Sequence, residues 1–177
     1  VALAITGGIG AGKSETLAAF ARHGAATPSA DDVVHELIAH DPAVRSALEA
    51  RFGTTDRSAI AKVVFDDPGE LAWLEALLHP LVRAHTEQWL ASVDAAVAVV
   101  EVPLLFETGG ESRFDRVVVV TAPSDVRRRR SANAVGPREQ RLSDDRGKAA
   151  RADYHYENTG SLDDLDRFVV GVLADLA

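Results

Sequence analysis

The sequence predicts an α/β fold built around a parallel sheet. Two unbroken valine-rich runs, at 97–102 and 116–121, are typical of strands that are buried on both faces of such a sheet. A third apolar run, at 1–6, leads into glycines and then into a helix-forming stretch. Strand patterns that alternate with helical patterns favour a doubly wound arrangement.

The N-terminal half is predicted to contain two strands and a run of helices. Residues 13–22 form a helix after the first strand, and residues 25–28 form a weak second strand. Ser29 is a suitable N-cap for the helix that follows it. Because no strand signal follows until the first valine-rich run, the sequence indicates a helical insertion beside the sheet. Breaks between its helices are expected at Pro42, 53–55, Pro68 and Pro80.

The remaining residues return to the alternation of strands and helices. The two valine-rich runs form the centre of the sheet, and a last strand is expected at 152–157. Helices are expected at 124–134 and 161–176, separated by a polar, basic stretch at 135–150. The predicted sheet therefore has five strands.

Composition and charge limit the classes of protein that fit. The chain has 177 residues and no Cys, which suits one domain in a reducing compartment such as the cytoplasm. No stretch approaches the ~18 apolar residues of a membrane span. A net charge of -8 argues against a general nucleic-acid binder. The segment 127–151 differs from the rest of this acidic chain, because it contains eight Arg and one Lys but only three acidic residues. Positive charge is therefore concentrated in one segment.

The stretch GGIGAGKSET, at 7–16, satisfies the phosphate-binding pattern G-x-x-x-x-G-K-S/T. Its glycines allow backbone N–H groups to converge on phosphate oxygens, and the helix that begins near Lys13 adds the positive end of its dipole. Lys13 supplies a charge at the β/γ bridge, and Ser14 is the expected Mg²⁺ ligand. The other positions expected to contact the nucleotide are Gly8, Gly10, Ala11, Gly12 and Glu15.

This loop by itself does not separate a small-molecule kinase from a GTPase, an ATP-driven motor or a nucleic-acid enzyme. A GTPase is expected to carry an N-K-x-D guanine reader, and the sequence has none. A motor ATPase normally needs a longer chain. The acceptor must therefore be sought in other motifs.

Four further stretches, in the right order, resemble the dephospho-CoA kinases, which use MgATP to phosphorylate the ribose 3'-hydroxyl of dephospho-CoA in the last step of coenzyme A synthesis. SADDVVHEL (29–37) resembles that family's D-A-D-x-x-x-x-x-L, and LLHPLV (77–82) resembles its H-P-x-V. EVPLLFETG (101–109) resembles D-x-P-L-L-F-E, and KAARADYHYENTGS (148–161) resembles K-x-x-x-A-D-x-x-I-x-N-x-G-S. The resemblance runs from Leu3 to about Leu165.

The resemblance implies a three-layer P-loop kinase fold with a parallel five-stranded sheet, a helical acceptor-binding insertion and a short lid. Residues 1–177 would form a single kinase domain that uses ATP and Mg²⁺ on the small molecule dephospho-CoA. We expect a monomer or weak homo-oligomer in the cytoplasm, with no nucleic-acid or membrane partner. The implied subregions are a core at 1–31, 93–133 and 151–177, an acceptor (CoA) region at 32–92 and a lid at 134–150.

The implied chemistry rests on carboxylates at two motifs. Asp31 matches the second carboxylate of D-A-D, which implies a general base that accepts the proton of the acceptor hydroxyl. Its alternative role is an acid in the first turn of a helix, favoured by the dipole. Ser29 stands where the family commonly has the first Asp. Glu101, at the carboxyl end of a strand, is a candidate to hold Mg²⁺ through water, or else it caps the next loop.

Two stretches contain the residues that the resemblance assigns to binding of the acceptor. Pro103, Leu104 and Leu105 would border the acceptor pocket, although packing in the core would also explain them. Glu107 is expected to meet a basic side chain of the lid or the substrate. His79 is placed on the CoA side by the resemblance; without it, a surface histidine is the simpler interpretation.

The basic segment and the last motif complete the candidate site. Arg129 matches the family's first lid-hinge arginine, and Arg138 falls in the lid, where a guanidinium can stabilise charge on the transferred phosphoryl group. The stretch that begins at Asn158 resembles the loop that passes the adenine in related kinases, or else it is a simple strand-to-helix turn. Asn133 replaces a common second Arg, and the lid is short. Another P-loop kinase of small metabolites, such as a nucleoside or nucleotide kinase, and a non-catalytic nucleotide-binding regulator are therefore the alternatives.

Overall fold

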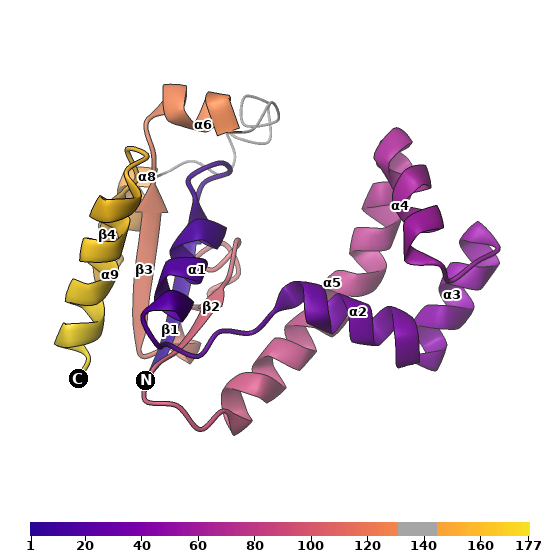
Figure 1. Cartoon of the computed structure of the whole chain (residues 1–177), viewed down its shortest axis with the longest axis horizontal. Coiled ribbons are helices and arrows are strands. Elements are labelled where there is room, and N and C mark those ends of the chain that lie inside the picture. Colours follow the sequence, from indigo (N-terminus) through magenta and orange to yellow (C-terminus); the bar gives the residue numbers. More distant parts are fainter. Residues whose placement is uncertain (131–144) are drawn as a thin grey trace. The chain divides into compact units, whose positions relative to one another are not determined.

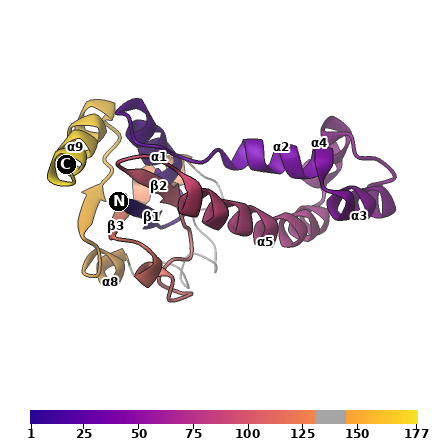
Figure 2. The ribbon, with the colours of Figure 1, turned by 90° about the horizontal axis from the view of Figure 1, so that it is seen from below.

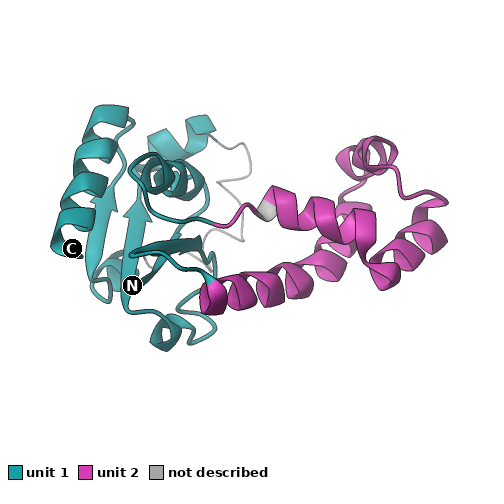
Figure 3. Ribbon diagram, turned by 60° about the horizontal axis from the view of Figure 1, so that its bottom comes forward, with its two compact units in different colours: residues 1–27, 93–177 teal, residues 28–92 magenta. Residues whose placement is uncertain are grey.

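The computed structural model describes residues 1–130 and 145–177, which form two compact units (Figure 3). Unit 1 consists of 1–27 and 93–177 and contains the sheet, and unit 2 consists of 28–92 and is helical. The roles predicted for the acceptor region and the lid stay predictions.

The sheet of unit 1 is parallel throughout and has the order β2-β1-β3-β4 (Figure 1). Its central strand β1 pairs with β2 through Ile5 and Glu101, and with β3 through Ile5 and Val118. Strands on both sides of β1 create the switch point at which ligands of open α/β sheets bind. The strands are β1 (Ala2–Gly7), β2 (Ala98–Glu101), β3 (Arg116–Thr121) and β4 (Tyr154–Glu157).

The prediction of five strands is wrong for the described residues, because the stretch at 25–28 forms only an isolated bridge. The Ala26 N–H donates to the Val97 carbonyl at 2.9 Å, and the Ala26 carbonyl accepts from the Val99 N–H at 2.8 Å. Pro28 has no N–H to extend the pairing, and Ser29 already caps the next helix. Too few residues are therefore left to form a strand.

Two helices cover one face of the sheet, α1 (Lys13–Arg22) and α9 (Leu162–Asp175) (Figure 2). Phe20 of α1 and Val169 of α9 are fully buried against strand residues such as Val118. The two helices are also linked at the surface, where Asp166 accepts a hydrogen bond from Arg22 and contacts His23. The hydrogen bond from Arg22 lowers the pKa of the Asp166 carboxyl.

The opposite face of the sheet is covered by irregular chain and by α8 (Asp145–Ala149) (Figure 2). Fully buried Leu105 packs there against Ala4 and Val119, which alternate along their strands with the residues of the first face. The short 3-10 helix η1 (Glu111–Arg113) precedes β3, and α6 (Ser124–Arg130) follows it. Unit 1 is therefore a three-layer structure.

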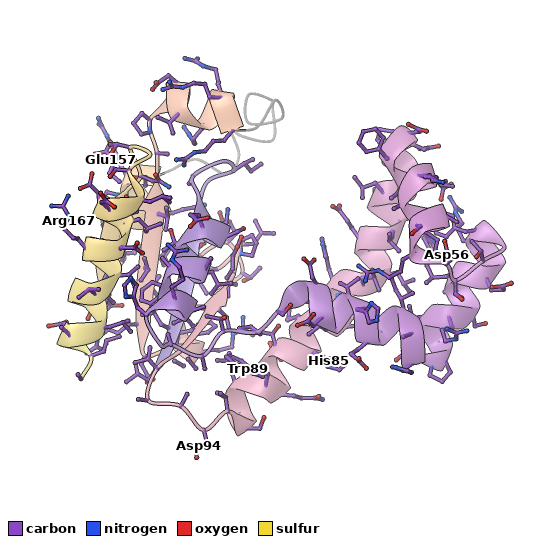
Figure 4. All side chains as sticks on the ribbon, viewed as in Figure 1. Asp56, His85, Trp89, Asp94, Glu157 and Arg167 are labelled. Carbon is purple, nitrogen blue, oxygen red and sulfur yellow. The ribbon has the colours of Figure 1, made fainter. Side chains whose placement is uncertain are left out.

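Unit 2 contains four helices, and each begins with a side-chain cap. The capping side chains, which each accept a hydrogen bond from the backbone N–H three residues later, are Ser29, Asp41, Asp56 and Asp67; Figure 4 labels Asp56. Fully buried Val44 and Leu48 lie in a separate apolar core. The helices are α2 (Ala30–His40), α3 (Pro42–Phe52), α4 (Arg57–Asp66) and α5 (Pro68–Ser92).

The expected break at Pro80 is absent, since α5 continues through it. A proline inside a helix removes one hydrogen bond and costs about 3 kcal/mol. The neighbouring side chains Leu77, Leu78 and Leu81 pack in the core of unit 2, and this burial offsets the cost. Although α5 is the longest described helix, no helix among the described residues has the length and apolarity to cross a membrane.

We predict that Gly7→Ala destabilises unit 1 by about 2 kcal/mol or more. Gly7 has φ 148°, and a Cβ atom there would lie 2.0 Å from the Val120 carbonyl oxygen of β3. Denaturant unfolding measures the loss of free energy. Gly24→Ala is the matched control, because Gly24 also has positive φ but no atom within 4 Å of the added Cβ. Equal losses in the two variants would show that the contact with Val120 is unimportant.

Candidate active site

The phosphate loop joins the central strand β1 to α1, as predicted. Gly10 and Gly12 have φ 73° and 99°, in the left-handed region that glycine adopts readily. Gly12 is the N-cap of α1, and no side chain of the described residues caps this helix. The N–H groups of its first turn are therefore available to an anion, aided by the helix dipole.

Lys13, Ser14 and Glu101 meet at the mouth of this loop. The Ser14 hydroxyl donates to Glu101 Oε2 at 2.9 Å, and Lys13 Nζ lies 3.9 Å from Glu101 Oε1. Lys13 also donates to the Gly8 carbonyl at 3.1 Å. Glu101 reaches this position because it ends β2 beside β1. A hydroxyl and a carboxylate are the hard oxygen donors that Mg²⁺ prefers.

Asn158 links the loop after β4 to the phosphate loop. It is 4% exposed, and its Nδ2 donates to the Ala11 carbonyl at 3.0 Å. Its Oδ1 accepts from the Gly160 N–H at 3.0 Å and from Arg130 at 3.1 Å. The amide oxygen accepts two hydrogen bonds and the amide nitrogen donates one, and together they determine the orientation of the Asn158 side chain. Gly12 must lack a side chain here, because a Cβ would lie 2.2 Å from Asn158 Nδ2.

A hollow of about 240 Å³ opens beside this network. Glu15 of α1 lines it and also accepts a hydrogen bond from Arg22 at 3.0 Å. Burial raises the pKa of the nearby Tyr156 phenol, which donates to the Ser161 carbonyl at 3.4 Å. The residues that line the hollow are Gly12, Glu15, Arg130, Asn158, Gly160, Ser161, Leu162 and Leu165.

Arg130, which no sequence motif singled out, is an arginine of α6 that reaches the phosphate loop. Its guanidinium donates to the Ala11 carbonyl at 3.4 Å as well as to Asn158. The side chain of the predicted Arg129 is 73% exposed and binds Asp125 of its own helix at 2.6 Å. Four consecutive arginines give no signal for which one faces the loop, since the answer depends on how α6 docks. Arg138 lies outside the described residues, and the catalytic roles of Arg129 and Arg138 stay predictions.

The segment after β2 carries the predicted acceptor residues. Leu105 is fully buried in the sheet's second face, so its side chain acts in the core, whereas Leu104 is 46% exposed and Pro103 is exposed. Glu107 meets a basic side chain, as expected: its Oε1 lies 2.6 Å from Nζ of Lys148. Whether these side chains contact an acceptor stays a prediction.

Unit 2 carries the other two predicted site residues. Asp31 is exposed in the first turn of α2, and His79 is exposed on α5. Ser29 is the N-cap of α2 and accepts from the Asp32 N–H at 3.1 Å. Serine therefore performs the capping that an aspartate could perform at the same position.

We predict that Asn158→Ala raises the dissociation constant of ATP by about tenfold, as expected when buried hydrogen bonds worth 1–2 kcal/mol are lost. The change removes the amide that holds both the Ala11 carbonyl and the Gly160 N–H. Isothermal titration with ATP measures the effect. Thr159→Ala, at the exposed neighbouring position, should leave the affinity unchanged. Equal affinities of the Asn158 variant and the unsubstituted protein would contradict this assignment.

The chain is similar to known proteins along its whole length. The family profile described as dephospho-CoA kinase matches residues 1–164. The dephospho-CoA kinase of Brucella melitensis biotype 1 is 36% identical over 193 residues, covering 100% of this chain and 96% of that protein. The crystal structure of TT1252 from Thermus thermophilus is 34% identical, with a TM-score of 0.68 and coverage of 100% and 98%.

A solved dephospho-CoA kinase from Campylobacter jejuni shares the fold, with a TM-score of 0.69 at 23% identity and coverage of 99% and 97%. The predicted P-loop kinase type of α/β fold is thus confirmed, with four strands among the described residues. The matched range of this chain contains the phosphate loop, Glu101 and Asn158. A match over 1–164, together with more than 30% identity to a relative that spans the same length, shows that the chain belongs to the dephospho-CoA kinase family.

Proposed function

We propose that this protein transfers the γ-phosphoryl group of ATP to the ribose 3'-hydroxyl of dephospho-CoA, which yields coenzyme A and ADP. The observation that carries the proposal is the meeting of Lys13, Ser14 and Glu101 at the phosphate loop of a chain that belongs to this family. Kinases of this fold catalyse transfer mainly by positioning and by stabilising charge. The residues of the loop therefore have separate tasks.

The nucleotide half of the site binds and orients the triphosphate. The N–H groups of the loop and of the first turn of α1 would bind the phosphate oxygens, and Lys13 would leave the Gly8 carbonyl to follow the β- and γ-phosphates. Asn158 and Arg130 would shape the adenine side, where the hollow lies. Arg129 and Arg138 are proposed to stabilise charge on the transferred group.

Ser14 and Glu101 fit a Mg²⁺ ion. Two oxygen donors close together match its preference for few protein ligands completed by water and phosphate oxygens. The described residues contain no cluster of three or more acidic, His or Cys side chains that could form a complete protein cage. When bound, Mg²⁺ neutralises charge that develops on the β- and γ-phosphates.

Asp31 is the proposed general base, on the strength of its match to the D-A-D motif. Its carboxylate would accept the proton of the ribose 3'-hydroxyl as that oxygen bonds to the γ-phosphorus. The bond from the γ-phosphorus to the β,γ-bridging oxygen breaks, and its electron pair leaves with ADP. Pro103, Leu104, Glu107 and His79 are proposed to orient the acceptor. We place the reaction in the cytoplasm, which suits a chain without Cys, in a monomer or weak homo-oligomer.

One assay tests the proposal. Purified protein is incubated with MgATP and dephospho-CoA, with nucleosides and nucleotides as competing acceptors, and the products are identified by mass. We expect 3'-phosphorylated product from dephospho-CoA. Turnover of another acceptor without this product would overturn the proposal in favour of a different small-metabolite kinase. Binding of ATP without turnover of any acceptor would instead indicate a regulator.

A further inference from the structure

The basic stretch at 148–151 does not extend freely from the sheet, because it is attached to the segment at 102–111. Lys148 is 7% exposed, and its ammonium lies 2.6 Å from the carboxylate of Glu107. Three residues later, the Arg151 guanidinium lies 4.3 Å from the centre of the Phe106 ring and forms an ion pair with Glu111. The two cations thus contact one segment at three of its residues, Phe106, Glu107 and Glu111.

Apolar contacts lie between these charged ones. Ala149 and Ala152 pack on the same cluster as Phe106, around fully buried Leu105. The segment at 102–111 is itself compact, since the Thr108 hydroxyl donates to the Leu104 carbonyl at 2.8 Å and the Gly110 N–H donates to the Leu105 carbonyl at 2.8 Å. Leu104 nevertheless remains 46% exposed. The attachment therefore orients an exposed apolar surface at Pro103 and Leu104.

Because Lys148 is buried, the attachment depends more on its ion pair with Glu107 than on the contacts of Arg151. A buried ammonium loses its hydration, and removal of its carboxylate partner leaves a charge without that compensation. The Arg151 contacts are more exposed, with the Arg151 side chain 51% exposed, so water screens them more strongly. Loss of the Lys148–Glu107 pair should therefore loosen the segment more than loss of the Arg151 pair.

We propose that Lys148 and Glu107 are positioning residues that hold the segment at 102–111 in the conformation that receives the acceptor. This inference rests on the proposed function, and it gives Lys148 a task that differs from binding phosphate. Lys148 then acts through Glu107 and the backbone beyond it. Its loss should weaken the use of dephospho-CoA while the phosphate loop, which lies at the end of β1, keeps its affinity for ATP.

The first test measures this division between the two substrates. Lys148→Met and Glu107→Gln should each raise KM for dephospho-CoA by about tenfold or more, and change KM for ATP by less than about threefold. The double variant should be no worse than the poorer single variant, because both remove one interaction. The charge swap Lys148→Glu with Glu107→Lys should recover part of the loss. Arg167→Met is the control, since Arg167, labelled on α9 in Figure 4, forms an exposed pair with Asp164.

A raised KM for ATP in Lys148→Met, with Glu107→Gln unaffected, would overturn the proposal and assign Lys148 to phosphate binding. The second test does not depend on turnover. Hydrogen exchange at the Thr108 and Gly110 amides should accelerate in Lys148→Met and Glu107→Gln, but not in Arg167→Met. Unchanged exchange in both variants would overturn the positioning role, whether or not the unsubstituted protein acts on dephospho-CoA. Accelerated exchange would support that role. If the unsubstituted protein then failed to phosphorylate dephospho-CoA, only the proposed function would be refuted.

Discussion

Lys13→Ala is expected to lower kcat/KM for ATP by about 10³-fold or more, the scale seen when a charge that stabilises the transferred phosphoryl group is lost. The side chain lies at the mouth of the phosphate loop, 3.1 Å from the Gly8 carbonyl and 3.9 Å from Glu101. Binding and transfer should therefore suffer together. Steady-state kinetics and titration with ATP measure the two effects separately.

Two controls make this result specific. Arg116→Ala removes a positive charge from the beginning of β3, where Arg116 pairs with Asp153, and should change kcat/KM by less than about threefold. Lys13→Arg retains the charge but replaces a compact ammonium by a planar guanidinium, and should remain strongly impaired. Near-normal turnover of Lys13→Ala would show that the nucleotide's phosphates bind elsewhere.

The second large effect is expected for Asp31→Asn, which should lower kcat by at least about 10²-fold while the affinity for ATP stays within about threefold. Asparagine has the shape of aspartate but cannot accept the hydroxyl proton at neutral pH. Asp31 is exposed in the first turn of α2, so its replacement should not disturb a core. Single-turnover kinetics with dephospho-CoA measure the transfer step directly.

The neighbouring Asp32 separates catalysis from helix stabilisation. It also lies exposed in the first turn of α2, so Asp32→Asn removes a comparable interaction with the helix dipole. We expect its kcat to change by less than about threefold. Equal losses in the two variants would assign Asp31 to the stability of α2 and not to proton transfer.

The local sequence pattern was sufficient to predict the elements in which apolar spacing and capping residues indicate the same bounds. The helix predicted at 13–22 and the strand predicted at 116–121 have the bounds that the structure gives to α1 and β3. Ser29 is an N-cap, as its position before a helical pattern indicated. At such positions, burial, capping and backbone preference all favour the same conformation.

Two errors of local prediction have tertiary causes. Pro80 remains helical because the leucines around it pack with α2, α3 and α4. The stretch at 25–28 fails to become a strand because only Ala26 reaches β2 before Pro28 and the cap of α2. Local propensities amount to a few kcal/mol at most, and packing or chain geometry can outweigh them.

The sequence by itself determined the phosphate loop, because its glycines, Lys13 and Ser14 are adjacent in the chain and their chemistry depends on local backbone geometry. It also indicated the family, through motifs spread from 7 to 161, and the profile match over 1–164 confirmed it. Only the tertiary structure decided that Arg130 contacts Ala11 and that Lys148 pairs with Glu107. These partners come from segments far apart in the chain, so their contacts depend on how α6 packs against the phosphate loop and α8 against the sheet, which no local pattern encodes.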